Sequence, residues 1–319
     1  MAGGQERILR RRIRSVESTK KITRAMELIA ASQMVRAQGR IAGSKPYLQG
    51  IERVLTDVVA DGSAPERLIG TPKSPDRVAV IAVVSDRGLC GGYNAFVLRA
   101  TERVIRTGEG AGRRYRVIGV GKKAIGYFRF RNRPLDESFT MGDRPNYELA
   151  REIARTVVPA FMARELDLVQ LVSTRFVSAG VQVVETRQLL PLEPRAREQG
   201  GGATLAPGEG YFEYEPDPEE LLSLLVPRYA EAALYGALLE ASASEHVSRQ
   251  RAMSAATENA DDLITNLRRV MNRARQDAIT TEIMEIVSGA EALRQGAQRE
   301  AAPIRKDSDL DRNAEERIA

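Results

Sequence analysis

A glycine-rich stretch, Ser85-Asp86-Arg87-Gly88-Leu89-Cys90-Gly91-Gly92-Tyr93-Asn94, follows a strand-like run and opens a helix-like segment. Backbone N–H groups at such a turn can bind a phosphate. The stretch lacks the G-x-G-x-x-G spacing and the Lys-Ser/Thr ending of a P-loop, and Gly121-Lys122-Lys123 has the same deficiency. We therefore expect a tight turn at the sheet edge and no bound cofactor, with a nucleotide-dependent enzyme as a weaker alternative.

The single cysteine and the single histidine restrict nucleophilic and metal chemistry. Cys90 precedes a helix start, where a thiolate is favoured. His246 lies in a distant, polar helical stretch, and no His, Cys or Asp stands four residues away to complete a metal pair. We predict no catalytic residue and no metal site, and we expect His246 to be a solvated helix residue.

Basic residues near the N-terminus form the strongest electrostatic feature of the sequence. They are Arg7, Arg10, Arg11, Arg12, Arg14, Lys20, Lys21 and Arg24. Such a cluster can follow a phosphate backbone, but no aromatic residues interleave with it for bases to stack on. A basic helix facing acidic protein loops explains the cluster equally well, and a nucleic-acid-binding protein with a coiled-coil arm remains the alternative function.

The basic cluster lies on the first of two long helical segments. Apolar or small residues recur there in alternating steps of four and three, which indicates a heptad seam. The positions are Ala30, Met34, Ala37, Ile41, Ser44, Leu48, Ile51, Leu55 and Val58. An upstream stripe at Ile13, Val16, Ile22, Met26 and Ile29 has a different phase and predicts a change of pitch near Ala30. Pro46 predicts a local kink.

The second long segment covers residues 217–292, with a seam at Ala260, Leu263, Leu267, Val270 and Ala274. Pro227 and Gly236 predict a short helix followed by a long one. Helices of about 80 Å exceed a globule with a radius of gyration of about 20 Å. Residues 1–58 carry twelve Lys/Arg against five Asp/Glu, whereas residues 217–290 carry seven against twelve. An antiparallel intramolecular coiled coil of the two helices follows.

The central region has the alternating texture of an α/β fold. Strands are expected at residues 77–85, 115–120, 166–176 and 181–190, the last one antiparallel, and helices at 94–106 and 146–163. The predicted fold is α/β with long helices: the coiled coil plus a small Rossmann-like α/β domain. The expected segments are 1–60 (helix), 75–192 (α/β domain), 193–216 (Gly-rich loop), 217–292 (helix) and 293–319 (charged, disordered tail).

Composition narrows the function only slightly. The formal net charge of +5 suits nucleic acid, an anionic membrane surface or acidic proteins alike. No apolar run approaches the roughly 20 residues of a membrane span, and the basic start lacks the apolar core of a signal peptide. From these features we expect a soluble, cytoplasmic chain.

Several motifs resemble the gamma subunit of F-type ATP synthases. Near the N-terminus they are Arg12-Ile13-Arg14-Ser15-Val16, Thr19 to Leu28 and Ala30-Ala31-Ser32-Gln33-Met34; in the middle, Asp86 to Gly92 with Asn94, and Tyr214-Glu215-Pro216-Asp217-Pro218. Near the C-terminus they are Ala255 to Ala260, Asn272 to Gln276, Ala278-Ile279-Thr280, Glu282-Ile283 and Glu285 to Ala290. These motifs follow the family's order over nearly 290 residues.

The resemblance implies a non-catalytic central rotor shaft that couples rotation of a proton-translocating membrane ring to ATP synthesis on beta subunits. Residues expected to contact the alpha-beta ring are Lys21, Arg24, Met26, Asp86, Arg87, Arg249, Arg275, Gln276 and Thr280. Residues expected at the foot, against the membrane c-ring and the epsilon subunit, are Tyr211, Tyr214, Glu215 and Asp217. The expected partners are therefore alpha, beta, epsilon and the c-ring, without nucleic acid.

The same resemblance suggests a location. The chain would associate with the membrane only through the complex, as a peripheral protein on the cytoplasmic face of a bacterial plasma membrane. With Cys90 alone, the paired-thiol redox switch of chloroplast relatives is not available.

Overall fold

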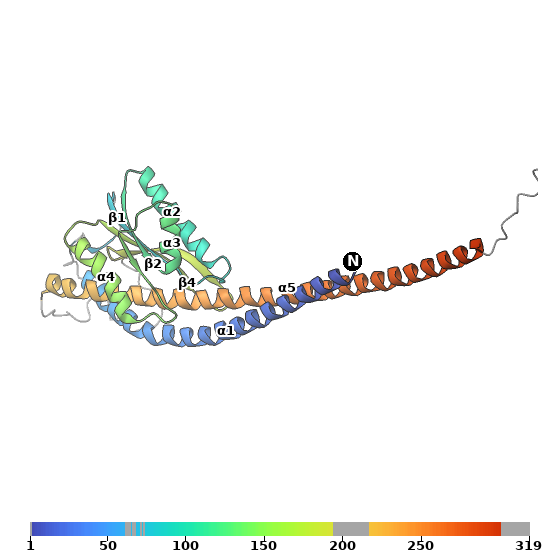
Figure 1. Cartoon of the computed structure of the whole chain (residues 1–319). Helices are drawn as coiled ribbons and strands as arrows, with labels where there is room; N and C mark the ends of the chain where they lie inside the picture. The colour runs from blue at the N-terminus through green and yellow to red at the C-terminus, as the bar shows by residue number, and fades with distance from the viewer. Residues whose placement is uncertain are drawn as a thin grey trace, which may run out of the picture. The chain divides into compact units, whose positions relative to one another are not determined.

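The structure, a computed structural model, describes residues 2–60, 65, 68–70, 72, 74–193 and 217–300. The chain divides into two compact units, one of residues 21–257 and one of residues 1–20 together with 258–319. Two long helices, α1 (Ala2–Ala60) and α5 (Pro218–Glu300), contribute to both units (Figure 1). The predicted loop 193–216 lies, from residue 194 onward, outside the described residues.

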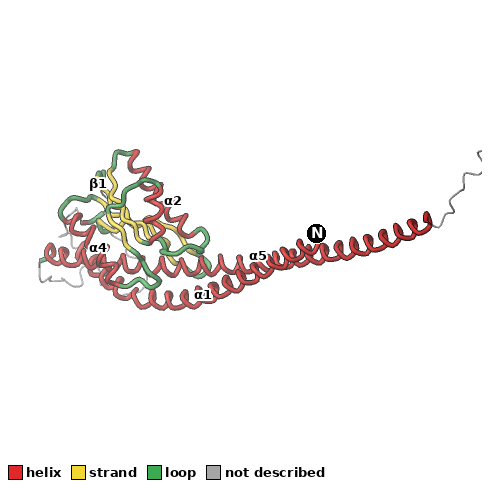
Figure 2. Tube along the Cα trace, viewed as in Figure 1, coloured by secondary structure: helices red, strands yellow, loops and turns green. Residues whose placement is uncertain are grey.

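The larger unit contains a five-stranded sheet in the order β3-β2-β1-β4-β5. Its strands are yellow in Figure 2. The first four strands pair in parallel, and β5 runs antiparallel to β4. The strands are β1 (Arg77–Val83), β2 (Arg114–Val120), β3 (Glu137–Phe139), β4 (Leu168–Phe176) and β5 (Gln182–Leu190). Central β1 is a run of Val, Ile and Ala buried on both sides, as a strand covered on both faces requires.

Helices cover both faces of this sheet. Val80 and Ala82 of β1 pack with α2 (Tyr93–Gly110) and α3 (Lys122–Phe130). Alternate residues of the same strand, such as Ile81, pack in a second core with α4 (Tyr147–Met162) and parts of α1 and α5. The side chain of Asn146 caps α4 by accepting a hydrogen bond from the Leu149 N–H at 3.0 Å.

The sequence prediction of the central domain is close to the structure but lacks two elements. Helix α3 and strand β3 were not expected, because α3 spans nine residues and β3 only three, too few for a clear periodic pattern. Gly121 starts α3 with φ +99°, and a Cβ atom there would lie 2.1 Å from the Val84 carbonyl oxygen. Only glycine fits this close approach of two backbone segments.

Within the larger unit, α1 and α5 pack in an antiparallel manner. Ala37 and Ile41 of α1 share a core cluster with Leu239 and Ala243 of α5. Farther along α1, Val58 packs in the core that contains the start of α5. The positions of the predicted seam from Ala30 to Val58 are all buried or half-buried.

The smaller unit repeats this arrangement. Ile13 of α1 packs against Ile264 and Leu267 of α5. Lys20 forms an ion pair with Asp261, and Glu17 forms one with Arg268. As the residue number falls from Lys20 to Glu17 on α1, the number of its partner rises from Asp261 to Arg268 on α5. The helices are therefore antiparallel here as well.

Two details of the predicted seams are wrong. Ile22 and Ile29 are 58% and 61% exposed, whereas Thr23 and Glu27 occupy the seam, so its phase does not change near Ala30. On α5 the predicted seam residues Leu263 and Val270 are exposed, and Ile264 is buried instead. The predicted seam and the seam that the structure buries both advance along α5 in alternating steps of three and four residues. Spacing alone therefore does not identify which face of α5 meets α1.

The prolines do not interrupt the helices. Helix α1 continues through Pro46, and α5 continues through Pro227, where the sequence predicts two separate helices. A proline inside a helix costs about 3 kcal/mol, but the flanking Leu222, Val226 and Ala230 are fully buried, and their packing offsets that cost. Helix α5 also extends through residues 293–300, for which a disordered tail was predicted.

Candidate partner interface

The outer face of α1 over residues 21–35 exposes aliphatic side chains. Ile22, Leu28, Ile29 and Val35 are between 58% and 62% exposed. The helix buries its opposite side, through Ala30 and Ala37, so these four side chains are not part of the core. Clustered exposed apolar residues rimmed by polar ones are typical of protein interfaces.

Basic groups border this aliphatic face. Lys21 and Arg24 are exposed, and Arg24 forms an ion pair with Glu27 at 2.9 Å. Met26 is half-buried. A partner surface that combines apolar and acidic side chains would match this face, because each side chain would lose water against a complementary group.

A second exposed region lies on α5 in the smaller unit. All residues from 279 to 294 are exposed, including Ile279, Ile283 and Ile286. Gln5 of α1 lines a shallow pocket with α5 residues as far as Thr281. From residue 282 to residue 294, the last α5 residue whose side chain is described, every side chain is exposed.

Three predicted contact residues lie at or just before the start of this α5 region. Arg275, Gln276 and Thr280 are all exposed. The hydroxyl of Thr280 donates to the Gln276 carbonyl at 3.0 Å, as helical threonines often do. The structure thus brings them together on the helix surface, while their predicted role in binding stays a prediction.

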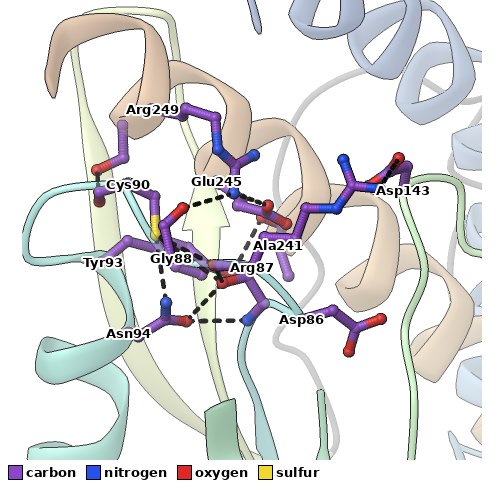
Figure 3. A network of polar contacts seen from close by, with 12 residues as sticks. Asp86, Arg87, Gly88, Cys90, Tyr93, Asn94, Asp143, Ala241, Glu245 and Arg249 are labelled. Carbon is purple, nitrogen blue, oxygen red and sulfur yellow. Dashed lines mark hydrogen bonds and ion pairs between the residues drawn. The ribbon is translucent and has the colours of Figure 1, made fainter. Parts of the chain in front are cut away.

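The glycine-rich stretch forms a tight turn between β1 and α2 (Figure 3). The Oδ1 atom of Asn94 accepts hydrogen bonds from the backbone N–H and the hydroxyl of Ser85, both at 2.9 Å. The amide nitrogen of Asn94 donates to the Cys90 sulfur at 3.2 Å. Gly91 adopts φ +57°, a left-handed conformation that glycine tolerates without strain.

This turn is fastened to α5 by three hydrogen bonds. Ser248 donates to the Cys90 carbonyl at 2.7 Å, and Arg249 donates to the Gly88 carbonyl at 3.2 Å. The Tyr93 hydroxyl donates to the Ala241 carbonyl at 3.1 Å. Arg249 also forms a 2.7 Å ion pair with Glu245, and both side chains are at most 10% exposed.

Asp86 joins three loops of the same unit. Its carboxylate accepts hydrogen bonds from the backbone N–H groups of Lys122 at 2.8 Å, Gly142 at 2.8 Å and Met141 at 3.3 Å. The first of these contacts caps α3, whose own N-cap residue is glycine. A carboxylate thus occupies the helix end where a phosphate could otherwise bind.

Two buried groups near this turn have shifted pKa values. Burial raises the pKa of the Cys90 thiol, so the thiolate is disfavoured. His246 is only 4% exposed, contrary to the predicted solvated position. Burial, with Arg249 and Arg40 adding positive charge, lowers its pKa to about 4. A polar local sequence does not reveal burial when neighbouring elements cover the helix.

The remaining predicted site residues differ in whether they are exposed, make internal contacts or lie outside the described residues. Arg87 is exposed and pairs with Asp143 at 3.2 Å. Arg249 and Asp86 make internal contacts, and their predicted contact with the alpha-beta ring stays a prediction. Asp217 is exposed beside the start of α5. Tyr211, Tyr214 and Glu215 lie outside the described residues.

Sequence reasoning missed Tyr93, Glu245 and Ser248 as anchors of the turn. The Glu245–Arg249 spacing of four residues was a usable signal, because side chains at i and i+4 meet on a helix. Among the described residues there is neither a helix apolar and long enough to cross a bilayer nor a group of three potential metal ligands.

Residues 5–293 match the family model described as ATP synthase. The chain is 44% identical over 299 residues to the ATP synthase gamma chain of Parafrankia sp. strain EAN1pec, covering 92% of this chain and 99% of the relative. It is 45% identical over 304 residues to that of Mycolicibacterium smegmatis, covering 90% and 97%.

Solved structures show the same fold. A chain of the OSCP/F1/c-ring part of the Euglena gracilis mitochondrial ATP synthase aligns with a TM-score of 0.64 at 16% identity, covering 95% of this chain and 98% of that one. A chain of the Tetrahymena thermophila central stalk and c-ring structure aligns with a TM-score of 0.54 at 24% identity, covering 74% and 99%. By its sequence relatives, this chain belongs to the ATP synthase gamma chain family.

Proposed function

We propose that the chain is the non-catalytic rotor shaft of a proton-translocating ATP synthase, in which its rotation links a membrane ring to conformational change in catalytic beta subunits. The observation that carries this proposal is the antiparallel packing of α1 and α5, which contact each other through a cluster of apolar side chains in each unit. Paired helices with interlocking side chains resist bending and twisting better than a flexible linker does. Membership of the gamma chain family supports the central-stalk role.

The chemistry of the outer faces suits a rotor that acts on several identical partners. A partner changes conformation only if it makes different contacts in its different states. The aliphatic face of α1 with Lys21 and Arg24 is one such contact surface. As the shaft rotates, each surrounding subunit would contact this face at one rotation angle and a different face of the shaft at the others.

The anchored turn has a separate role in this proposal. Hydrogen bonds from Ser248 and Arg249 fasten the α/β body to α5, and the buried ion pair with Glu245 fixes the Arg249 side chain. Torque applied to the body would therefore reach α5 without slippage. Asp86 and Arg249 act here as internal positioning residues, while Lys21, Arg24, Arg275, Gln276 and Thr280 remain candidates for direct contact.

The proposed partners are the alpha and beta subunits around the helices, and the epsilon subunit and c-ring at the predicted foot. The exposed aliphatic residues of α5 between 279 and 294 suit an apolar protein sleeve. Apolar contact is non-directional and tolerates rotation better than fixed ion pairs. The complex would place the chain at the cytoplasmic face of a bacterial plasma membrane, as a peripheral protein.

The test is a helix-breaking change inside the seam. Leu267 is buried against Ile13, and Leu267→Pro would remove a helical hydrogen bond there at a cost of about 3 kcal/mol. We expect the assembled complex in reconstituted vesicles to lose ATP-driven proton pumping more than ATP hydrolysis. The matched control, Leu267→Met, keeps the apolar seam and should retain both activities.

Equal loss of both activities in a fully assembled Leu267→Pro complex would contradict the shaft mechanism. Subunit composition must be checked first, because a complex that fails to assemble also loses both. Co-purification of the intact chain with alpha and beta subunits is therefore measured in parallel. Steeply salt-dependent binding to DNA without such co-purification would favour the nucleic-acid alternative.

A further inference from the structure

Positive charge is concentrated in a segment whose charged side chains the proposed rotor mechanism does not use. Residues 93–133 contain eleven Lys/Arg and two Asp/Glu, a net charge of +9, although the whole chain carries only +5. Nine of the eleven are arginines. The segment comprises α2, β2, α3 and the adjoining loops.

The fold gathers these charges on one outer surface. Val97 and Ile105 of α2 and Phe128 of α3 are buried against the same face of the sheet. The two helices lie next to each other over that face (Figure 1), so their polar sides point away from the sheet. The exposed basic residues on them, hereafter the α2–α3 face, are Arg99, Arg103, Arg106, Lys122, Lys123 and Arg129.

The carboxylates near this face are already engaged. Glu102 pairs with Arg131 at 3.2 Å and with Arg106 at 3.9 Å. Glu109 accepts two hydrogen bonds from Arg133, at 2.8 and 3.0 Å, and this contact lowers the pKa of Glu109. Among the described ion pairs, none involves Arg103, Lys122, Lys123 or Arg129.

Unneutralised like charges on neighbouring helices repel one another, so the face gains most from a ligand that supplies negative charge. Exposed aromatic rings accompany the charges: Phe130 is 83% exposed and Phe96 is 56% exposed. Arginine with exposed aromatic residues is the composition typical of protein interfaces. We propose that the α2–α3 face binds an acidic protein segment that carries apolar side chains among its carboxylates.

A protein segment is favoured over a nucleic acid by what the surface already holds. The two-point contact between Arg133 and Glu109 shows that guanidinium groups here can form the fork geometry that carboxylates accept. The Phe96 ring already has the Arg99 guanidinium 5.1 Å from its centroid, which restricts stacking of a nucleic-acid base. This inference does not depend on rotation.

The experiment measures binding of fluorescent poly-L-glutamate to the full chain at physiological salt. The face variant combines Arg103→Gln, Lys123→Gln and Arg129→Gln. The matched control combines Arg53→Gln, Arg144→Gln and Arg164→Gln, which removes three exposed charges that lie outside this face and outside the N-terminal basic cluster. Circular dichroism and urea unfolding must show that both variants fold as the wild type does.

We expect the face variant to bind poly-L-glutamate about tenfold more weakly and the control to change less than about twofold, because local charge complementarity outweighs net charge. Equal weakening in both variants, or a larger loss in the control, would overturn the proposal. Duplex DNA and phosphatidylglycerol vesicles are titrated alongside. If either binds more tightly than poly-L-glutamate and loses that binding in the face variant, the face recognises phosphate and the acidic-protein assignment is wrong.

Discussion

Helix α5 contains two stretches that differ completely in their surroundings. Between Ala230 and Arg249 nearly every residue is buried, whatever side of the helix it occupies. From residue 279 to residue 294 every residue is exposed. The buried stretch is rich in small residues such as Ala237, Ala241 and Ser244, whereas the exposed stretch carries larger aliphatic ones such as Ile283 and Ile286.

The contrast shows that apolar character alone does not decide burial along this helix. Small residues let α1 approach α5 closely, as where Ala37 of α1 and Ala243 of α5 share a core cluster. The larger aliphatic residues near Ile283 find no covering element among the described residues of their unit. We infer that the first stretch serves internal stability and the second serves a partner.

The largest expected difference in the free energy of unfolding comes from breaking one buried and one exposed ion pair. Glu245–Arg249 and Glu17–Arg268 have nearly equal distances, 2.7 and 2.8 Å, but the first pair is buried and the second exposed. Glu245→Ala would leave Arg249 buried without its carboxylate, at a cost of roughly 3–5 kcal/mol. Glu17→Ala should cost at most about 1 kcal/mol.

Urea unfolding of the two variants against the wild type measures this difference. Similar losses for Glu245→Ala and Glu17→Ala would mean that the burial of the first pair does not raise its importance. Far-UV circular dichroism before unfolding shows whether each variant keeps its helices.

Truncating a leucine in each stretch should have a smaller but still large effect. Leu238 is 0% exposed and Leu293 is 78% exposed. Leu238→Ala would open a cavity and lower the free energy of unfolding by about 3 kcal/mol. Leu293→Ala should change it by less than about 0.5 kcal/mol. A destabilisation at Leu293 comparable to that at Leu238 would show that the exposed stretch is covered within the chain itself.

Lowering the pH should reduce the free energy of unfolding through His246, which lies in the buried stretch. The folded state holds this imidazole neutral with a pKa of about 4, while the unfolded chain protonates it near the ordinary value of 6.5. As the pH falls from 7.5 to 5.5, the unfolded state gains a proton that the folded state does not, so stability decreases by about 1.4 kcal/mol. Below the folded pKa the difference stops growing.

The measurement compares the pH dependence of unfolding in the wild type and in His246→Gln. The comparison is needed because burial raises the pKa of the neighbouring Glu245, which titrates in the opposite sense. The variant should show a flatter profile over this range. Since the chain has one histidine, its NMR imidazole signal reports the pKa directly, and a value near 6.5 would contradict the predicted loss.

Much of the fold was predictable from local pattern. The β-branched run in β1, the heptad spacing from Ala30 to Val58 and the opposite net charges of the terminal segments indicated the strands, the long helices and their pairing. The family motifs identified the function class. These features are set by neighbouring residues in the chain, because hydrophobic periodicity and propensity act locally.

Only the tertiary structure decided which helix face is buried and which polar side chains make internal contacts. Ile264 rather than Leu263 faces α1, Arg249 and His246 are buried, and Asp86 caps α3 from another loop. Pro227 stays helical because packing on both sides offsets its cost. Burial depends on which distant segments meet, and that depends on the sum of many contacts across the fold rather than on any local run of sequence.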